Sequence, residues 1–318
     1  MNPEKSPYIN IHRIEFVVTH WCSGKCRHCS VGEQLNLPER TKHVLSQKAI
    51  ETIQNLSALF NVTSVMTFGG EPLLFPDVVC AIHKKSADCG IAARQLITNG
   101  YFTKNKERCA EVAKKLAAAG INNLLISVDA FHQETIPIEA VYQFAHAVVA
   151  AGIEGVSLQP AWVVNEDNDN VYNAETREVL SRFSNLGIPI NGGNNIFMAG
   201  NAARYLAEYY PKPNLNLSDQ CGSMPYTDPL TQISSLSIVP NGDVMICNFV
   251  IGNIYTEDIA EIVARYNPYK NKYVRAILEG GAKGLLSCAK KTGIAIDTAQ
   301  CYSICDICHK ITAQTTQQ

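Results

Sequence analysis

The feature that most constrains the fold of this chain is a regular alternation between two kinds of segment. Between about residues 11 and 196, short β-branched apolar runs alternate with longer segments whose apolar residues recur about every 3.6 positions. This pattern is typical of repeated βα units around a parallel sheet, so the fold class is predicted to be α/β. The predicted strands are residues 14–19, 62–68, 92–98, 123–128, 155–163 and 188–191. Helices are expected between them, for example over residues 50–60 and 141–149.

Polar or glycine residues mark the ends of four strands at a constant interval. Gly69, Asn99, Asp129 and Gln159 are each 30 positions apart, although the segments between them share no motif. The interval therefore indicates βα units of similar size rather than a sequence repeat. Because the carboxyl ends of parallel strands meet at one edge of a sheet, we expect these residues to converge on one site.

The character of the sequence changes after Gly192 and Gly193. A segment rich in Pro and Asn, residues 211–218, leads to a hairpin pattern in which residues 232–239 and 243–247 flank Pro240-Asn241-Gly242. Helices are expected over residues 259–265 and 273–278, before a cysteine-rich tail. We therefore predict two domains, a barrel-like unit over residues 1–205 and a smaller α+β cysteine-rich unit over residues 206–318.

Charge and hydropathy exclude several classes of protein. The 318 residues include 27 Lys plus Arg and 29 Asp plus Glu, a net charge of −2, so no basic nucleic-acid arm is expected. No apolar run approaches the ~20 residues that a membrane span needs, and the N-terminus lacks the apolar core of a signal peptide. We expect a cytoplasmic protein that binds neither nucleic acid nor membrane.

Twelve cysteines are unusual for a chain of this kind. In a reducing compartment they are not expected to form a disulfide framework, so metal or cluster binding is favoured. Eight of them are grouped: Cys22, Cys26 and Cys29 early, Cys221 and Cys247 later, and Cys301, Cys305 and Cys308 near the C-terminus. Cys80, Cys89 and Cys109 lie in or beside helical patterns and are expected to be small buried apolar residues, whereas Cys288 stays open.

The early group is the run Cys22-Ser-Gly-Lys-Cys26-Arg-His-Cys29, directly after the first predicted strand. Three thiolates on one loop can hold three irons of a [4Fe-4S] cluster and leave the fourth iron open to another ligand. A zinc site is the alternative, but zinc motifs usually combine two distant pairs of ligands.

This run resembles the signature of radical S-adenosylmethionine (SAM) enzymes, and Gly69-Gly70-Glu71-Pro72 resembles their SAM-binding motif. The resemblance continues through residues 98–100 and 127–129 and covers most of residues 11–200. It implies a partial (β/α)6 barrel whose open iron is chelated by the amino and carboxylate groups of SAM. His28 departs from the family pattern, because the position before the third cysteine is often aromatic.

The resemblance also implies roles for the residues at the strand ends. The segment Gly69 to Pro72 is expected to meet the methionyl amine of SAM, with Glu71 bracing the loop rather than contacting SAM. Ser127 and Asp129 suit ribose or methionyl groups, although an Asp at this position could instead cap the next helix. The remaining candidates are Asn99 and Gln159 for the cofactor, Asn191 by position alone, and His132 for proton transfer or substrate contact, unless His132 is an ordinary loop residue.

The late cysteines resemble the auxiliary-cluster domain of the same family, called SPASM or, in its shorter form, twitch. The shared element is Gly242-x4-Cys247, followed by Cys301, Cys305 and Cys308. Together with Cys221 this makes five cysteines where a [4Fe-4S] cluster needs four. Our first choice is Cys221, Cys247, Cys305 and Cys308; Cys221 lies further ahead of Gly242 than the usual pattern, so Cys301 stays an alternative, as does zinc.

The implied activity is reductive cleavage of SAM to a 5′-deoxyadenosyl radical that abstracts hydrogen from a substrate, with electrons from a donor such as flavodoxin or ferredoxin. Relatives with such C-terminal domains commonly modify peptides or proteins, which favours that substrate class. Only a short arm, residues 1–13, precedes the first predicted strand, so no leader-binding domain is expected there and a small metabolite is the alternative. A non-enzymatic zinc-binding adaptor is the alternative from another class.

Overall fold

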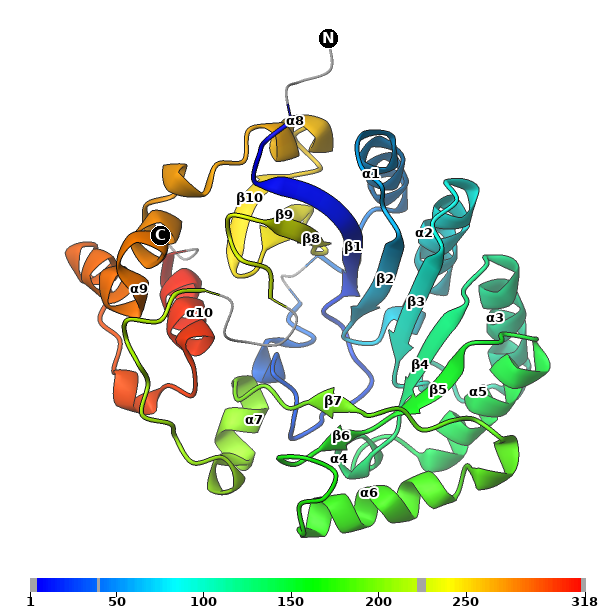
Figure 1. The fold of residues 1–318 in the computed structure, drawn as a ribbon. Helices are drawn as coiled ribbons and strands as arrows, with labels where there is room; N and C mark the ends of the chain where they lie inside the picture. The colour runs from blue at the N-terminus through cyan, green and yellow to red at the C-terminus, as the bar shows by residue number, and fades with distance from the viewer. Residues whose placement is uncertain (1–4, 39–40, 222–226, 316–318) are drawn as a thin grey trace.

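A single curved sheet organises the molecule (Figure 1). The computed structural model describes residues 5–38, 41–221 and 227–315. The sheet has eight strands in the order β10-β9-β8-β1-β2-β3-β4-β5, and a separate pair is formed by β6 and β7. Strands β1 to β5 and β8 run parallel, whereas β9 is antiparallel to both β8 and β10.

The strands are β1 (Ile9–Thr19), β2 (Ser64–Gly69), β3 (Ala93–Thr98), β4 (Asn123–Ser127), β5 (Val156–Gln159), β6 (Ala161–Trp162), β7 (Asn194–Asn195), β8 (Ile233–Ile238), β9 (Asp243–Ile246) and β10 (Phe249–Asn253). The α-helices are α1 (Ser46–Leu59), α2 (Pro76–Asp88), α3 (Lys106–Ala118), α4 (Ala130–Gln133), α5 (Ile138–Ala150), α6 (Val171–Ser181), α7 (Gly200–Tyr205), α8 (Ile259–Ala264), α9 (Lys272–Lys291) and α10 (Ile304–Thr315).

The two faces of the sheet differ in polarity because side chains alternate along each strand. On β1, Ile14, Phe16 and Val18 have no exposed surface and join the main apolar core with residues of the helices. Helices α1, α2, α3 and α5 lie along this outer side (Figure 1). Arg13 and Glu15 point to the opposite, concave face. The protein is therefore α/β, a partial barrel whose inner face is partly polar.

Five of the six predicted strands are present, with ends shifted by a few residues. The first begins at Ile9, inside the arm expected to precede it, whose first four residues lie outside the described part of the chain. The fifth prediction was too long, because Pro160 ends β5 after Gln159. The sixth was wrong as a full strand. Around Pro189, which has no N–H to donate, only a single bridge between Leu158 and Ile190 forms.

The predicted hairpin is confirmed as β8 and β9, with Gly242 at φ +88° in the turn. The sequence did not predict β10, which adds a third strand. Strand β8 pairs with β1, so the C-terminal strands continue the barrel sheet, and a division of the chain after residue 205 stays a prediction. The helix predicted at 273–278 is the first part of α9, which kinks at Gly281.

No helix within the described ranges is both long and apolar enough to cross a lipid bilayer.

Candidate metal and cofactor site

The loop that follows β1 places three cysteines close together at the carboxyl edge of the sheet. Burial raises the pKa of Cys22 to about 12, and it also raises the pKa of Cys26, whose thiolate is further disfavoured by charge on Asp129, Cys22 and Cys29. Three thiolates packed this closely repel one another, so they need a cation between them. This donor set suits a metal cluster, and none of the twelve cysteines, all within the described ranges, forms a disulfide.

Residues distant in sequence hold the cysteine loop in place. The Asn36 side chain accepts a hydrogen bond from the backbone N–H of Cys22 (2.8 Å) and donates one to the Cys22 carbonyl (3.1 Å). Asn201, at the start of α7, donates its backbone N–H to the carbonyl of Cys29 (3.0 Å) and its side-chain amide to that of Cys26 (3.1 Å). Sequence reasoning missed both asparagines; 175 positions separate Asn201 from Cys26, and no local pattern links them.

The glycines of the Gly69 to Pro72 segment allow it to lie against the chain that leads into the cysteine loop. A Cβ on Gly70 would lie 2.1 Å from the carbonyl oxygen of Trp21, and one on Gly69, at φ +141°, would lie 2.5 Å from that of Thr19. The backbone N–H groups of Gly70 and Glu71 donate to these same two oxygens, at 2.8 and 2.7 Å. In this structure the two glycines allow a close approach to the protein's own backbone.

Glu71 ties the second strand end to the third. Its fully buried carboxylate accepts hydrogen bonds from the N–H of Leu73 (2.8 Å), the hydroxyl of Thr98 (2.7 Å) and the N–H of Asn99 (2.8 Å). Burial raises the pKa of Glu71 to about 7, although these three bonds oppose the shift. These contacts are those of a brace, as the sequence predicted for this residue.

Asn99 continues the connection from the third strand to the cysteine loop. Its side-chain amide donates to the Cys22 Sγ (3.6 Å) and to the Ser23 hydroxyl (3.2 Å), and its Oδ1 accepts from the N–H of Tyr101 (2.8 Å). Asn99 therefore lies against a candidate cluster ligand, in addition to shaping the turn as expected.

Asp129 and His132 form a buried pair after β4. Asp129 caps α4 by accepting the N–H of His132 (2.9 Å), and its two oxygens lie 2.9 and 2.8 Å from the His132 Nδ1. Its Oδ2 also accepts the N–H of Ala161 (3.0 Å). Burial opposes the charge on Asp129, but His132 outweighs it and lowers the pKa of Asp129 to about 2; in turn, burial opposes the charge on His132, and Asp129 raises the pKa of that imidazole. The helix-capping role considered from the sequence is present, and the pair leaves one ring nitrogen of His132 available.

Two other strand ends carry buried polar side chains. Ser127 and Gln159 are neighbours in the register of β4 and β5, and both are buried. The Gln159 amide donates to Asn194 Oδ1, but within the described residues its Oε1 and the Nε2 of Gln133 have no partner although both atoms are buried. Buried polar atoms without partners are costly, so this region suits a polar ligand. Asn191, by contrast, is bonded to Ser157 and to the N–H of Gly193.

The late cysteines form a second group on the hairpin and α10. The thiols of Cys221 and Cys247 are hydrogen-bonded, and charge on Cys221 reaches both Cys305 and Cys308. Cys305 and Cys308 are three residues apart on α10, so they share one face of that helix. Burial raises the pKa of Cys308 to about 12 and that of Cys305 to about 11. Four thiols therefore converge here.

Cys301 does not join this group. Its buried Sγ lies 3.5 Å from the Lys310 Nζ and 3.5 Å from the carbonyl oxygen of Asp297. Lys310 is itself paired with Asp306 at 3.0 Å. The geometry supports our first choice of four ligands, in which Cys301 is not included.

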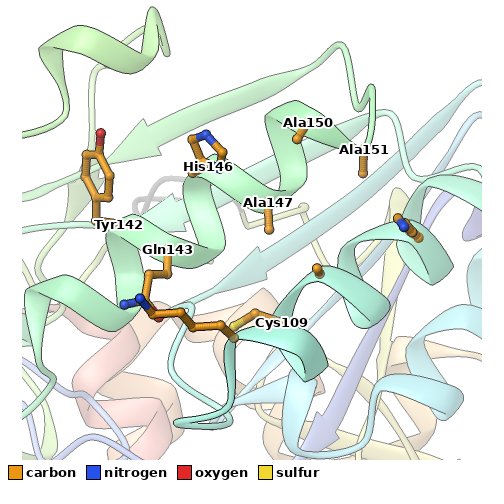
Figure 2. Close-up of a pocket in the computed structure, with 10 residues that line it drawn as sticks. Cys109, Tyr142, Gln143, His146, Ala147, Ala150 and Ala151 are labelled. Atoms are coloured by element: carbon orange, nitrogen blue, oxygen red, sulfur yellow. The ribbon is translucent and has the colours of Figure 1, made fainter.

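The four remaining cysteines and an outer hollow lie away from these groups. Cys109 is buried and Cys80 and Cys89 are half-buried against the core, while the Cys288 thiol faces the carbonyl of Lys272 on α9. Figure 2 shows an apolar hollow between α3 and α5, lined by residues such as Tyr142 and His146. None of the candidate ligand, cofactor or catalytic residues lines this hollow, so it is not part of the candidate site.

Comparison with known proteins shows the family to which the chain belongs. Residues 16–200, more than half of the chain, match the family model of the radical SAM superfamily. The chain belongs to the radical SAM superfamily. Residues 231–309 match the iron-sulfur cluster-binding domain called SPASM. This radical SAM protein is thus of an enzyme class that uses SAM with a [4Fe-4S] cluster. It also has a domain for an auxiliary cluster. These two findings replace the alternative of a non-enzymatic zinc-binding adaptor.

Curated relatives match only part of the chain. A GTP 3′,8-cyclase of Lactiplantibacillus plantarum is 36% identical over 119 residues, which are 37% of this chain and 33% of the relative. A probable GTP 3′,8-cyclase of Saccharolobus islandicus is 25% identical over 215 residues, 63% of this chain and 64% of the relative. The chain thus spans between a third and two thirds of their length.

Among solved structures, anSMEcpe with bound AdoMet superposes with a TM-score of 0.52 at 12% identity, covering 97% of this chain and 94% of that one. At this identity the likeness shows the fold alone.

The buried Glu71 gives a pH dependence that can be tested. Because its pKa in the folded state, about 7, exceeds the ordinary 4.5, the folded protein binds this proton more tightly than the unfolded chain. Its contribution to stability is therefore complete below about pH 4.5 and is lost as the pH rises through 7. We expect the free energy of unfolding, measured with urea on cluster-free protein, to fall between pH 5 and pH 8. The fall should be ~1–3 kcal/mol larger for the wild type than for Glu71→Gln. Glu139→Gln, at an exposed site, should follow the wild type; parallel curves for all three proteins would contradict the assignment.

The position of Cys301 predicts different outcomes for two neighbouring cysteines. Cys305→Ser should remove one cluster and lower the iron content by about half, because it deletes a ligand of the four-cysteine group. Cys301→Ser should keep its iron, since this thiol is bonded to Lys310 instead. Iron analysis and the visible spectrum of anaerobically purified variants measure this, and loss of iron from Cys301→Ser alone would reverse the assignment.

Proposed function

We propose that Cys22, Cys26 and Cys29 hold the SAM-binding [4Fe-4S] cluster and that Cys221, Cys247, Cys305 and Cys308 hold the auxiliary cluster. The observation that carries the first assignment is the convergence of three thiols at the carboxyl edge of the sheet, next to the strand end that Glu71 braces. Four thiols close the second site, which leaves no iron there for SAM.

When bound, the first cluster supplies the electron that splits SAM into methionine and a 5′-deoxyadenosyl radical, which then takes hydrogen from a substrate. The chain's own contribution is to hold and shield the cofactor. We assign Ser127 and Gln159 to polar contacts with SAM, because they are buried at adjacent strand ends and the Gln159 Oε1 has no partner among the described residues. Gly69, Gly70 and Pro72 form the turn that meets the methionyl group. We assign Glu71, Asn99 and Asp129 to positioning, since their polar atoms are bonded to the protein.

The concave face of the sheet supports a substrate of low net charge. Arg13 donates from Nε to Glu15 (2.7 Å), from Nη1 to Ser64 (3.0 Å) and from Nη2 to Gln95 (2.9 Å). Glu15 in turn accepts from the hydroxyl of Ser237 (3.0 Å). These side chains share one face by register, and their charges cancel. Among the described residues, this part of the concave face therefore offers hydroxyl and amide groups, and the charge of Arg13 is paired with Glu15.

A nucleoside triphosphate does not match this charge pattern. Its several negative charges need multiple cations, and Arg13 is already neutralised by Glu15. We therefore propose that the substrate differs from the GTP named for the curated relatives. A peptide or protein group stays our first candidate, because amide and hydroxyl groups suit it; a small uncharged metabolite is the second, favoured by the small-molecule substrate in the relatives' names.

Four further assignments complete the proposal. The auxiliary cluster acts on the substrate side, as an electron acceptor or relay. A low-potential donor such as flavodoxin or ferredoxin supplies the first cluster. We place the protein in the cytoplasm, where a reducing environment keeps cluster cysteines from forming disulfides. His132 stays a candidate for proton transfer through the ring nitrogen that Asp129 leaves available.

The first assignment predicts the iron content and the cleavage of SAM. Anaerobically prepared protein should contain about eight irons per chain, and joint replacement of Cys22, Cys26 and Cys29 by Ala should remove about half of them. With dithionite and SAM, the wild type should form 5′-deoxyadenosine slowly, whereas Cys26→Ala should form none. Cys109→Ala is the matched control, because Cys109 lies in the helix layer. Conversion of SAM to S-adenosylhomocysteine without deoxyadenosine would refute the radical assignment.

The charge of the concave face predicts that GTP is not a substrate. Addition of GTP to the reduced enzyme with SAM should leave the rate of deoxyadenosine formation within about twofold, and GTP should be recovered unchanged. Liquid chromatography measures both quantities. Consumption of GTP together with a tenfold faster SAM cleavage would show that the polyphosphate is accommodated after all.

A further inference from the structure

A second group of potential metal ligands overlaps the first cysteine group. The Sγ of Cys26 and one ring nitrogen each of His28 and His132 all lie within 4.8 Å of one another. Cys22 and Cys29 do not belong to this group, and neither histidine belongs to the cysteine triad. The two sets of ligands therefore share Cys26 alone.

His132 is oriented as a metal-binding histidine usually is. Its Nδ1 is held by both oxygens of the buried Asp129, at 2.8 and 2.9 Å, so its Nε2 is the nitrogen left for a ligand. Asp129 is fixed by the N–H of Ala161 and has no exposed surface. A carboxylate behind the imidazole sets the orientation of the ring and makes it a better donor.

His28 is also held in place with a free nitrogen. Its ring packs on Phe131, with centroids 5.0 Å apart, and against the ring of His132, with centroids 4.8 Å apart. The Nδ1 of His28 is buried and has no hydrogen-bond partner among the described residues. A buried ring nitrogen without a partner is an observation that the cysteine triad does not explain.

The distances suit a single divalent ion. Zn–S bonds of ~2.3 Å and Zn–N bonds of ~2.0 Å place tetrahedral ligand atoms ~3.3–3.6 Å apart. The three atoms lie within 4.8 Å of one another, so binding has to bring them closer by at most ~1.5 Å, and water can complete the fourth position. Apolar residues, including Phe131 and Val163, pack around Cys26 and shield the site.

We propose that, before the first cluster is assembled, Cys26, His28 and His132 bind one Zn²⁺ or a similar divalent ion. Binding replaces the thiol proton of Cys26, which passes to solvent, and no electron is transferred. Because Cys26 belongs to both ligand sets, the ion and the first cluster exclude each other. The site holds the loop in a metal-bound form that cluster assembly has to displace.

The test uses Co²⁺ as a probe with the full-length, cluster-free protein under anaerobic conditions. Metal analysis after gel filtration should give about two Co²⁺ per chain, one at the four late cysteines and one at the proposed site. The proton NMR spectrum should show paramagnetically shifted, exchangeable imidazole N–H signals that the late site, which has only thiolates, cannot produce.

Variants separate this site from the cysteine triad. Cys26→Ser, His28→Asn and His132→Asn should each bind about one Co²⁺ and lose the shifted imidazole signals. Cys29→Ser is the matched control: it removes a proposed cluster ligand but should keep both Co²⁺ ions. The Co²⁺ at the late cysteines reports in every variant that the chain is folded.

Three outcomes would overturn the proposal. One is that the wild type binds a single Co²⁺ and the histidine variants do not differ from it. Another is that Cys29→Ser loses the same ion as Cys26→Ser, which would assign the ion to the three cysteines. The last is that protein with both clusters assembled still binds Co²⁺ with imidazole signals, which would remove the mutual exclusion. The cluster assignment is tested separately by the iron content of His28→Asn. If this variant keeps the four irons of the first cluster, the assignment of that cluster to the three cysteines stands.

Discussion

The parallel pairing of β1 is the constraint on which the rest of the structure depends. This central strand hydrogen-bonds to β2 on one side and to β8 on the other, so it joins the barrel strands and the C-terminal hairpin in a single sheet. Its apolar side faces the helices and its polar side faces the concave surface. The cysteine loop leaves directly from its carboxyl end, so the position of Cys22, Cys26 and Cys29 is set by the register of β1 with β2.

Several polar residues at the strand ends form hydrogen bonds within the protein. Glu71 bonds the second strand end to the third, Asn99 bonds the third to Cys22, and Asp129 caps α4 while fixing His132. Buried carboxylates are tolerated here because their oxygens accept several hydrogen bonds each. These contacts thereby organise the loop that is proposed to carry the cluster.

Cys26 belongs to two proposed sets of metal ligands, the three cysteines of the loop and the group that it forms with His28 and His132. Its thiol lies near those of Cys22 and Cys29 and near the rings of His28 and His132, and it is buried among apolar side chains. Soft thiolates favour iron-sulfur clusters, whereas a mixed set of one thiolate and two imidazoles favours zinc and its neighbours. Cluster assembly on the three thiols therefore has to displace an ion held by the mixed set.

The sequence by itself determined the order of the βα units, the cysteine loop, the Gly69 to Pro72 turn and the Asn241-Gly242 hairpin, because apolar periodicity, ligand spacing and turn chemistry are local. Only the tertiary structure decided that Cys301 pairs with Lys310, that Asn36 and Asn201 clamp the cysteine loop, and that His28 and His132 meet beside Cys26. It also reduced the sixth strand to one bridge at Ile190 and continued the sheet into β8. These contacts either join segments that are distant along the chain or depend on how strands pair. No local sequence pattern shows which cysteines, asparagines or strand edges will pack together.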